Sequence, residues 1–412
     1  MKYKYALIIL FLYVLAFSSC EFKRSLEGEP VNIRADAARS SGYEEYGDFY
    51  LYSAYKDIPN IEDTTGSYIP PLALASNKVV VSNLKGKVIL LTGNDTEWVA
   101  NLDSNAVAMS AMCADPEQNI YLPANNEVIY SFSKKGDLRW KKHFPHPEDD
   151  FVVMSDLLAL RDAVIVGSSR GLLAKIGFDG NIIWEKKYPI AVGRTFSADI
   201  HGNLIIPLTH KSYGMTDTLL MLSPEGKRKW AFRENNFRFM TYPVIADTII
   251  YIGGVSGKSE GKKNYIIAVN KNSGEKIWEQ ETEAIPRFIS ASIENFLYVI
   301  SYDLGLGKPI TITSCYSPAG DKIWENYYQT TAYSPLLISD EYLAFSGRTS
   351  NTRGLYFLEK SGKYIKTVSL SNLPKIVMTP EVRPDGVIIF AGSRKLAIIR
   401  TDEIWINKII PW

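Results

Sequence analysis

Cysteine and histidine are scarce in this chain of 412 residues, which has three of the first and four of the second. A zinc site needs three or four converging ligands. Histidines and carboxylates crowd together only in the segment 143–150, and a proline-broken connector in solvent explains that segment better than a metal site. Cys113 and Cys315 lie far apart with no motif around either. We expect them to be small buried side chains rather than a disulfide, and we assign no metal.

An excess of charge of one sign is also missing, because 46 basic residues face 45 acidic ones. Phosphate backbones are bound by a basic surplus, so the composition argues against nucleic acid as a partner. The chain has no phosphate-binding loop, no Gly-x-Ser-x-Gly elbow and no calcium loop. We therefore assign no catalytic residue and no cofactor-binding residue from motifs.

The first twenty residues have the form of an export signal. Two lysines precede an apolar run over residues 6–17, which is too short for a spanning helix of about 20 residues. Small residues then lead to Cys20. This pattern resembles a bacterial lipoprotein signal, so we expect removal of residues 1–19 and lipidation of Cys20. Plain secretion without a lipid is the alternative, and nothing else in the chain is long and apolar enough to span a membrane.

Tryptophans recur along the remaining sequence at a nearly constant spacing. The first six of the set are separated by 42, 44, 46, 48 and 46 residues, and the last gap of 81 is two periods in which Lys366 holds the missing position. Five copies also carry a glycine four residues earlier. The tryptophans are Trp98, Trp140, Trp184, Trp230, Trp278, Trp324 and Trp405, and the glycines are Gly136, Gly180, Gly226, Gly274 and Gly320.

Each of these glycines follows an apolar run, which indicates a strand, a polar turn and a further strand that ends at the tryptophan. A second pair of apolar runs lies upstream in each period, so one repeat is four short strands. Units of this kind at this period are propeller blades. The sequence predicts an all-β fold, one eight-bladed β-propeller of four-stranded antiparallel blades over residues 68–412. The blades are placed at 68–103, 104–146, 147–190, 191–236, 237–284, 285–330, 331–372 and 373–412. A seven-bladed ring is the alternative, and it would require one repeat to be discarded.

Residues 20–67 differ from the repeats. Up to residue 42 the composition is that of a flexible tether. Six aromatic residues then cluster between Tyr43 and Tyr55. We expect this cluster to lie against the propeller, and an added outer strand is one way for it to do so.

The turn and tryptophan resemble the repeat of the PQQ-like, quinoprotein-type propellers. The fullest match is the segment 268–278, which ends in Gly274 and Trp278 and follows the pattern Ala-x-Asp-x-x-Thr-Gly-x-x-x-Trp with Asn and Ser as near equivalents. The resemblance covers residues 68–412. The PQQ-like family includes both quinone-dependent dehydrogenases and the propeller lipoprotein of the outer-membrane barrel-assembly machinery. The chain is similar to the second group in length, lipobox and repeat number, and it lacks the adjacent cysteines of many members of the first.

One end of the predicted ring carries basic residues. Arg194, Arg238 and Arg287 stand three residues before a hydroxyl that recurs near the start of the innermost strand, and the loops between the second and third strands are rich in lysine and arginine, including Arg348. Arginine forks suit carboxylates and phosphates, so we hypothesise that this end binds an anionic surface or ligand. The alternative is that the arginines brace the packing between blades. For the recurring hydroxyls we favour bonding to the protein's own backbone.

These observations favour a lipid-anchored, non-catalytic scaffold of the bacterial cell envelope, on the outer membrane. Such a scaffold would be a monomer within a complex, with an envelope protein or peptide as partner and the lipid on Cys20 as its membrane contact. It needs no cofactor. Two alternatives stay open: a small oxidoreductase that binds PQQ, and a glycan-binding lipoprotein that uses Tyr327, Tyr328 and Tyr333.

Overall fold

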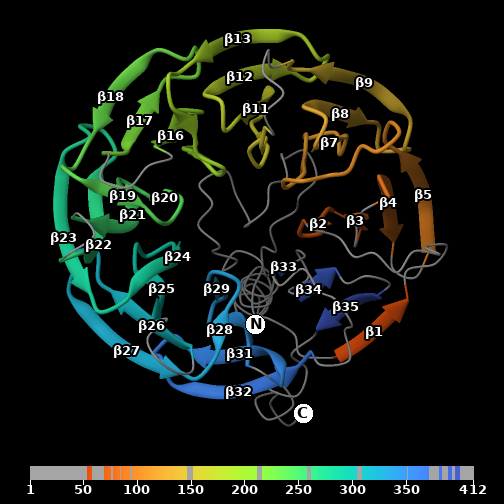
Figure 1. Ribbon diagram of the computed structural model, residues 1–412. Coiled ribbons are helices and arrows are strands. Elements are labelled where there is room, and N and C mark those ends of the chain that lie inside the picture. Colours follow the sequence, from red (N-terminus) through yellow and green to blue (C-terminus); the bar gives the residue numbers. More distant parts are fainter. Residues whose placement is uncertain are drawn as a thin grey trace, which may run out of the picture.

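Eight small antiparallel sheets stand around a central axis in the computed structural model (Figure 1). The structure describes residues 53–57, 69–75, 78–83, 85–92, 95–145, 152–210, 216–257, 261–303, 309–349, 351–370, 380–382, 388–391 and 395–399. Cys20 and Trp405 lie outside these ranges. Within them every regular element is a strand, and no helix is long and apolar enough to cross a membrane.

The first four blades follow one another along the chain, each from its innermost to its outermost strand. Blade 1 is β2 (Leu72–Ala73), β3 (Lys78–Ser82), β4 (Lys87–Thr92) and β5 (Asp95–Asn101). Blade 2 is β6 (Cys113–Ala114), β7 (Ile120–Pro123), β8 (Val128–Phe132) and β9 (Leu138–His143). Blade 3 is β10 (Leu158–Ala159), β11 (Ala163–Gly167), β12 (Leu172–Gly177) and β13 (Ile182–Lys187). Blade 4 has a divided inner strand and is β14 (Ala191–Val192), β15 (Ser197–Ala198), β16 (Leu204–Thr209), β17 (Thr218–Leu222) and β18 (Arg228–Phe232).

The last four blades complete the ring. Blade 5 is β19 (Phe237–Phe239), β20 (Val244–Ala246), β21 (Ile249–Ser256), β22 (Lys263–Asn270) and β23 (Lys276–Thr282). Blade 6 is β24 (Ile285–Ala291), β25 (Leu297–Asp303), β26 (Ile310–Tyr316) and β27 (Lys322–Tyr328). Blade 7 is β28 (Thr331–Ala332), β29 (Leu337–Ile338), β30 (Tyr342–Arg348), β31 (Arg353–Glu359) and β32 (Tyr364–Ser369). Blade 8 is β33 (Glu381–Val382), β34 (Ile388–Ala391), β35 (Lys395–Ile399) and β1 (Ser53–Asp57). The predicted eight-bladed, all-β architecture is confirmed.

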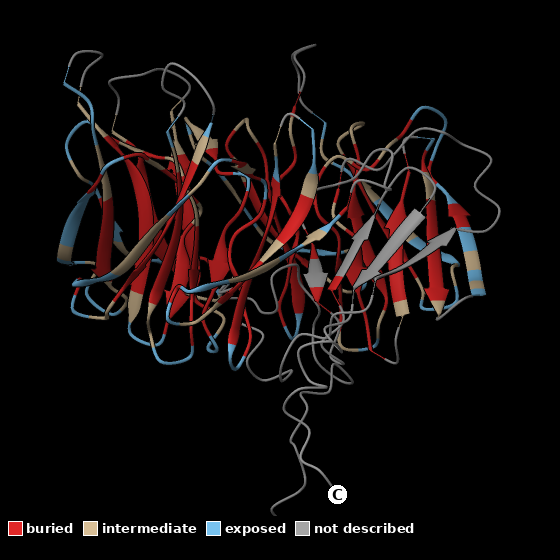
Figure 2. Ribbon diagram, turned by 90° about the horizontal axis from the view of Figure 1, so that it is seen from below, coloured by how far each residue is buried: buried red, intermediate tan, exposed pale blue. Residues whose placement is uncertain are grey.

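The core lies in the seams between blades, and Figure 2 shows it as a continuous buried band with exposed loops at both ends. Successive residues of one strand enter different cores. Val164 of β11 packs in a cluster with side chains of blade 2, whereas Ile165 packs with side chains of blade 4. A strand in this position is buried on both faces, which explains why the apolar runs in the sequence do not alternate with polar residues.

Blade 8 takes its outermost strand from the start of the chain. Strand β1 pairs antiparallel with β35, from Ser53 opposite Ile399 to Asp57 opposite Lys395. The strand thus comes from before residue 68, from the segment that was expected to lie against the propeller. It occupies the position in which the sequence suggested a strand ending at Trp405.

The outermost strands are longer than the sequence suggested. They were expected to end at the tryptophan, yet Trp278 is the third residue of β23, which continues to Thr282. Tyr327 and Tyr328 follow Trp324, beyond the expected end of that strand, and they belong to β27. Polar residues dominate these strands because one face and one edge meet solvent, so the apolar pattern that marks the inner strands is absent.

Candidate functional site

Each of the six repeat tryptophans that the structure describes is hydrogen-bonded to the next blade. The indole Nε1 of Trp278 donates a hydrogen bond of 2.9 Å to the carbonyl oxygen of Pro318, in the turn of blade 6 that contains Gly320. The same bond is made by Trp98, Trp140, Trp184, Trp230 and Trp324, each to the corresponding turn of the following blade. The tryptophan is therefore a clamp across the seam between two blades.

The glycines of the repeat make room for that clamp. Gly320 has φ +96°, and a Cβ added there would lie 2.9 Å from the Trp278 ring. Gly274 has φ +75°, and its Cβ would lie 2.6 Å from the ring of Trp230. A left-handed backbone and a facing ring both demand glycine. Gly136, Gly180 and Gly226 meet the preceding tryptophan in the same way, and so does Gly362 of blade 7.

A β-bulge precedes the tryptophan position on each of the first seven blades, and in blade 7 Lys366 holds that position. In blade 5, Trp278 lies opposite Ala268 and Lys276 lies opposite Val269, so Ile277 is the additional residue. The corresponding register shift occurs in the other six blades. A bulge of this kind re-aims the next side chain, and here it directs the tryptophan across the seam.

Five of the recurring hydroxyls near the inner strands bond the protein's own backbone, whereas the buried Ser290 hydroxyl has no hydrogen-bond partner among the described residues. Ser110 donates to the carbonyl of Met154 at 2.6 Å, and Ser197 donates to that of Pro243 at 2.7 Å, each on the next blade. The hydroxyl of Ser155 instead accepts the amide of Gly167 within its own blade at 2.7 Å. Hydrogen bonding to the backbone is the role expected for these recurring hydroxyls.

Arg194 is exposed and contacts a junction of three blades whose carboxylate, Asp156, is buried. Its Nη2 donates to the carbonyl of Met109 in blade 2 at 3.1 Å, and its Nε lies 3.8 Å from Asp156 Oδ1 in blade 3. The buried Asp156 carboxylate accepts the amide of Ala111 at 2.9 Å and the hydroxyl of Thr195 at 2.6 Å. Asp156 was not identified from sequence. Its partners are 45 residues before it and 39 after it, which no local motif reveals.

The other arginines of the predicted site differ in their surroundings. Arg287 lies over the ring of Tyr302, with Cζ 6.0 Å from the ring centroid. Arg238 is half-buried in β19, and Arg348 is exposed at the end of β30, opposite Arg353. Burial and the nearby Tyr333 raise the pKa of Tyr302, so that ring stays neutral beneath Arg287. The contacts of Arg194 join blades, as the bracing interpretation expects. The contact of Arg287 lies within blade 6, and anion binding by this group stays a prediction.

An anion test separates the two interpretations of the arginines. If the group binds anions, pyrophosphate should raise the melting temperature of the protein, and Arg194→Ala/Arg238→Ala/Arg287→Ala should abolish that rise. Thermal unfolding with and without pyrophosphate measures both. If pyrophosphate does not change the melting temperature of the unchanged protein, anion binding is contradicted and only the bracing interpretation remains.

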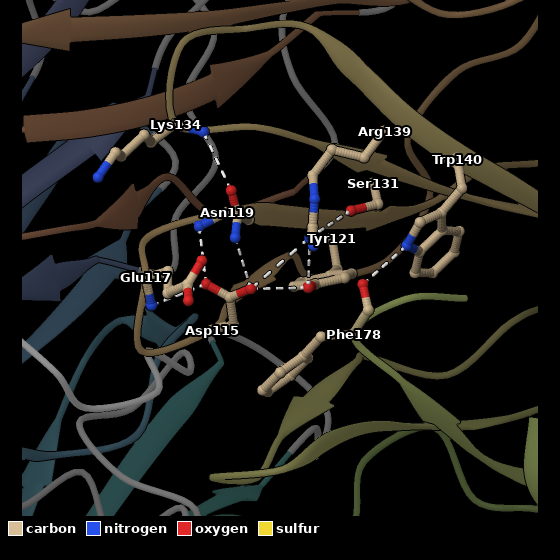
Figure 3. A network of polar contacts seen from close by, with 9 residues as sticks. All are labelled: Asp115, Glu117, Asn119, Tyr121, Ser131, Lys134, Arg139, Trp140 and Phe178. Atoms are coloured by element: carbon tan, nitrogen blue, oxygen red, sulfur yellow. Dashed lines mark hydrogen bonds and ion pairs between the residues drawn. The ribbon is translucent and has the colours of Figure 1, made fainter. Parts of the chain in front are cut away.

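A second polar network holds the turn between the first two strands of blade 2 (Figure 3). Asp115 accepts the amides of Glu117 and Asn119 at 2.9 and 2.8 Å and the hydroxyl of Tyr121 at 2.8 Å. Arg139 donates to that hydroxyl at 2.8 Å from the outermost strand. Burial raises the pKa of Tyr121, as does its bond to Asp115. The network therefore ties the inner and outer strands of one blade, and its acid is occupied by structural contacts.

The remaining sequence candidates are placed as follows. Cys113 and Cys315 are buried, as expected, and burial raises the pKa of the Cys315 thiol to about 12. Tyr328 packs on Phe345 with ring centroids 5.4 Å apart, whereas Tyr327 is exposed on the outer wall. The part of the chain that the structure describes contains no cluster of three possible metal ligands.

The closed ring of eight four-stranded sheets, clamped by tryptophan and glycine, defines a β-propeller of the PQQ-like class. Residues 60–280, more than half of the chain, match the family described as outer membrane protein assembly factor BamB. The chain belongs to that family.

Solved structures share the fold at low identity. BamB from Moraxella catarrhalis superimposes with a TM-score of 0.62 at 13% identity, covering 85% of this chain and 99% of that one. A europium-containing methanol dehydrogenase gives 0.67 at 12%, covering 90% of each chain. Sqt1 of Saccharomyces cerevisiae gives 0.62 at 11%, covering 86% and 99%. A search of curated proteins finds no match to the sequence. Since an enzyme and an assembly factor share the architecture, the fold alone does not assign an activity.

Proposed function

We propose that this protein is an exported, lipid-anchored scaffold of the bacterial cell envelope, which holds protein partners during outer-membrane protein assembly and performs no catalysis. The family match over residues 60–280 supports this role. Export and lipidation at Cys20 follow from the signal-like N-terminus. The propeller would supply a rigid body with exposed loops and outer strands for partners.

The observation that carries the proposal is how the buried carboxylates are used. Asp115 and Asp156 bond amides and hydroxyls of the protein itself, and Asp199 accepts the amides of His201 and Asn203. Catalytic acids and bases are usually held ready for a substrate in a cleft. These carboxylates are instead fixed between strands and blades, which suits a body whose task is to keep its shape.

Cross-linking in intact cells tests the proposal. A tagged chain is cross-linked mildly, purified and examined by mass spectrometry, with Cys20→Ser as the control that removes the proposed lipid site. We expect an outer-membrane assembly protein in stoichiometric yield from the unchanged chain and less from the variant. Recovery of a bare monomer, with absorption beyond that of tryptophan and tyrosine, would instead favour the quinoprotein alternative.

A further inference from the structure

The additional residue of the bulge, one position before the clamp, differs in character around the ring. On blades 1, 2 and 4 it is charged and bonded within its own blade. Glu97 pairs with Lys78 at 2.8 Å, Arg139 bonds Tyr121 at 2.8 Å, and Lys229 bonds Asn203 at 3.3 Å. A charged and engaged residue on an outermost strand is a common way to keep that strand from pairing with other chains.

Blades 3, 5, 6 and 7 carry isoleucine at this position instead. In the neighbouring blades 5 and 6, Ile277 is 47% exposed and Ile323 is 55% exposed, although both are large and apolar. Their strands β23 and β27 are neighbours on the rim (Figure 1). The hydroxyl of Tyr327 in β27 lies 2.9 Å from the carboxylate of Glu283, which directly follows β23. Two exposed isoleucines thus stand on adjacent outermost strands.

The surroundings of these isoleucines are acidic. Residues 275–283 and 321–328 contain six carboxylates and two lysines. Lys276 is shared by Glu234 and Glu279 at 2.8 and 2.7 Å, and Lys322 pairs with Glu325 at 3.0 Å. Lys263 pairs with Glu281 at 2.8 Å, and the Glu283 carboxylate accepts the Tyr327 hydroxyl and interacts electrostatically with Lys322. A partner for this wall should therefore be basic, and an anionic lipid surface would be repelled.

The wall also offers a strand edge. β23 and β27 are the last strands of their sheets, so half of their backbone groups point outward. Beyond the bulge, β23 runs in regular register from Glu279 opposite Ile267 to Thr282 opposite Asn264. An extended polypeptide can add to such an edge through main-chain hydrogen bonds, and its alternate side chains can meet the exposed isoleucine.

We propose that the outer wall of blades 5 and 6, centred on Ile277 and Ile323, docks an extended basic segment of a partner protein in which lysine or arginine alternates with apolar residues. The inference rests on the proposed scaffold role for the existence of a partner. The wall itself is defined by exposure, charge and a free strand edge.

A labelled ten-residue peptide of alternating lysine and valine is the probe, and fluorescence anisotropy with the full mature chain is the measurement. We expect Ile277→Ser/Ile323→Ser to weaken binding at least tenfold. Ile183→Ser is the matched control, because Ile183 is 53% exposed at the same bulge position of blade 3, where two lysines follow in β13. It should leave binding unchanged. Glu279→Gln/Glu281→Gln/Glu283→Gln should weaken binding and reduce its dependence on salt.

Equal affinity of the unchanged chain and the double isoleucine variant would overturn the proposal, as would equal affinity for a peptide of alternating glutamate and valine. Self-association of the chain that the double variant abolishes would assign the wall to a second copy, and would overturn it too. The double variant is checked by thermal melting, because the substitutions are at the surface and should leave the fold intact. If cross-linking in cells still captures the assembly protein with the double variant, the scaffold role is supported and the proposed docking site on this wall is contradicted.

Discussion

Replacing Trp278 with alanine is expected to lower the free energy of unfolding by about 2–3 kcal/mol, which is less than the cost of about 3–5 kcal/mol for removing a fully buried tryptophan side chain. The ring is half-buried between blades 5 and 6, and its removal leaves a gap against Gly320 and the Pro318 carbonyl without its donor. Urea unfolding followed by far-ultraviolet circular dichroism measures the change.

Two further variants identify the source of that loss. Trp278→Phe keeps a ring but removes the Nε1 donor, so it should cost about 1 kcal/mol, the usual net value of one hydrogen bond. Gln280→Ala, at an exposed position of the same strand, should change stability by less than about 0.5 kcal/mol. A Trp278→Ala protein as stable as the Gln280→Ala protein would contradict the clamp.

Asp156→Ala is expected to lower the free energy of unfolding by about 3 kcal/mol, because buried groups that lose their partner cost about 1–3 kcal/mol each. The carboxylate is the shared acceptor of Ala111 in blade 2 and Thr195 in blade 4. Its removal would leave the Ala111 amide without that acceptor in a dry interior, and it would uncouple three inner strands at once. The same urea titration applies.

A double-mutant cycle with Thr195→Val tests whether the junction acts as a unit. The two substitutions together should cost less than the sum of the single costs, by about 0.5–3 kcal/mol, because they remove the same bond. Glu294→Ala, an exposed acid of blade 6, is the control and should be nearly neutral. Strictly additive costs for Asp156 and Thr195 would show that the carboxylate does not couple them.

The sequence predicted the architecture because the clamp is periodic. Every blade from the first to the sixth repeats one tryptophan in one bulge, so the spacing of that residue counts the blades. The glycine was correctly expected in a turn, but its contact with the tryptophan of the preceding blade was not anticipated. That contact joins residues about one repeat apart, and the turn pattern alone accounts for the glycine.

The polar junctions and the outer wall were harder to predict. Asp156 looks like an ordinary loop acid, since its partners belong to the neighbouring blades. Ile277 and Ile323 look like strand residues of a core, and only the bulge turns them outward. The sequence does carry one signal for the outer wall, in the position directly before each tryptophan. Some repeats have a charged residue there and others have isoleucine, which separates charged outer strands from apolar ones.

The pairing of β1 with β35 also sets the order in which the molecule can form. Ser53 and Ile399 are about 350 residues apart, so the last sheet closes only after nearly the whole chain has emerged from the ribosome or the translocation channel. Contacts between such distant segments form slowly, because a very long loop must be closed first. Until then β35 presents an open edge on which another strand could pair. Newly made chains are therefore most exposed to mispairing at blade 8, and a propeller of this design should depend on chaperones until its first strand pairs with β35.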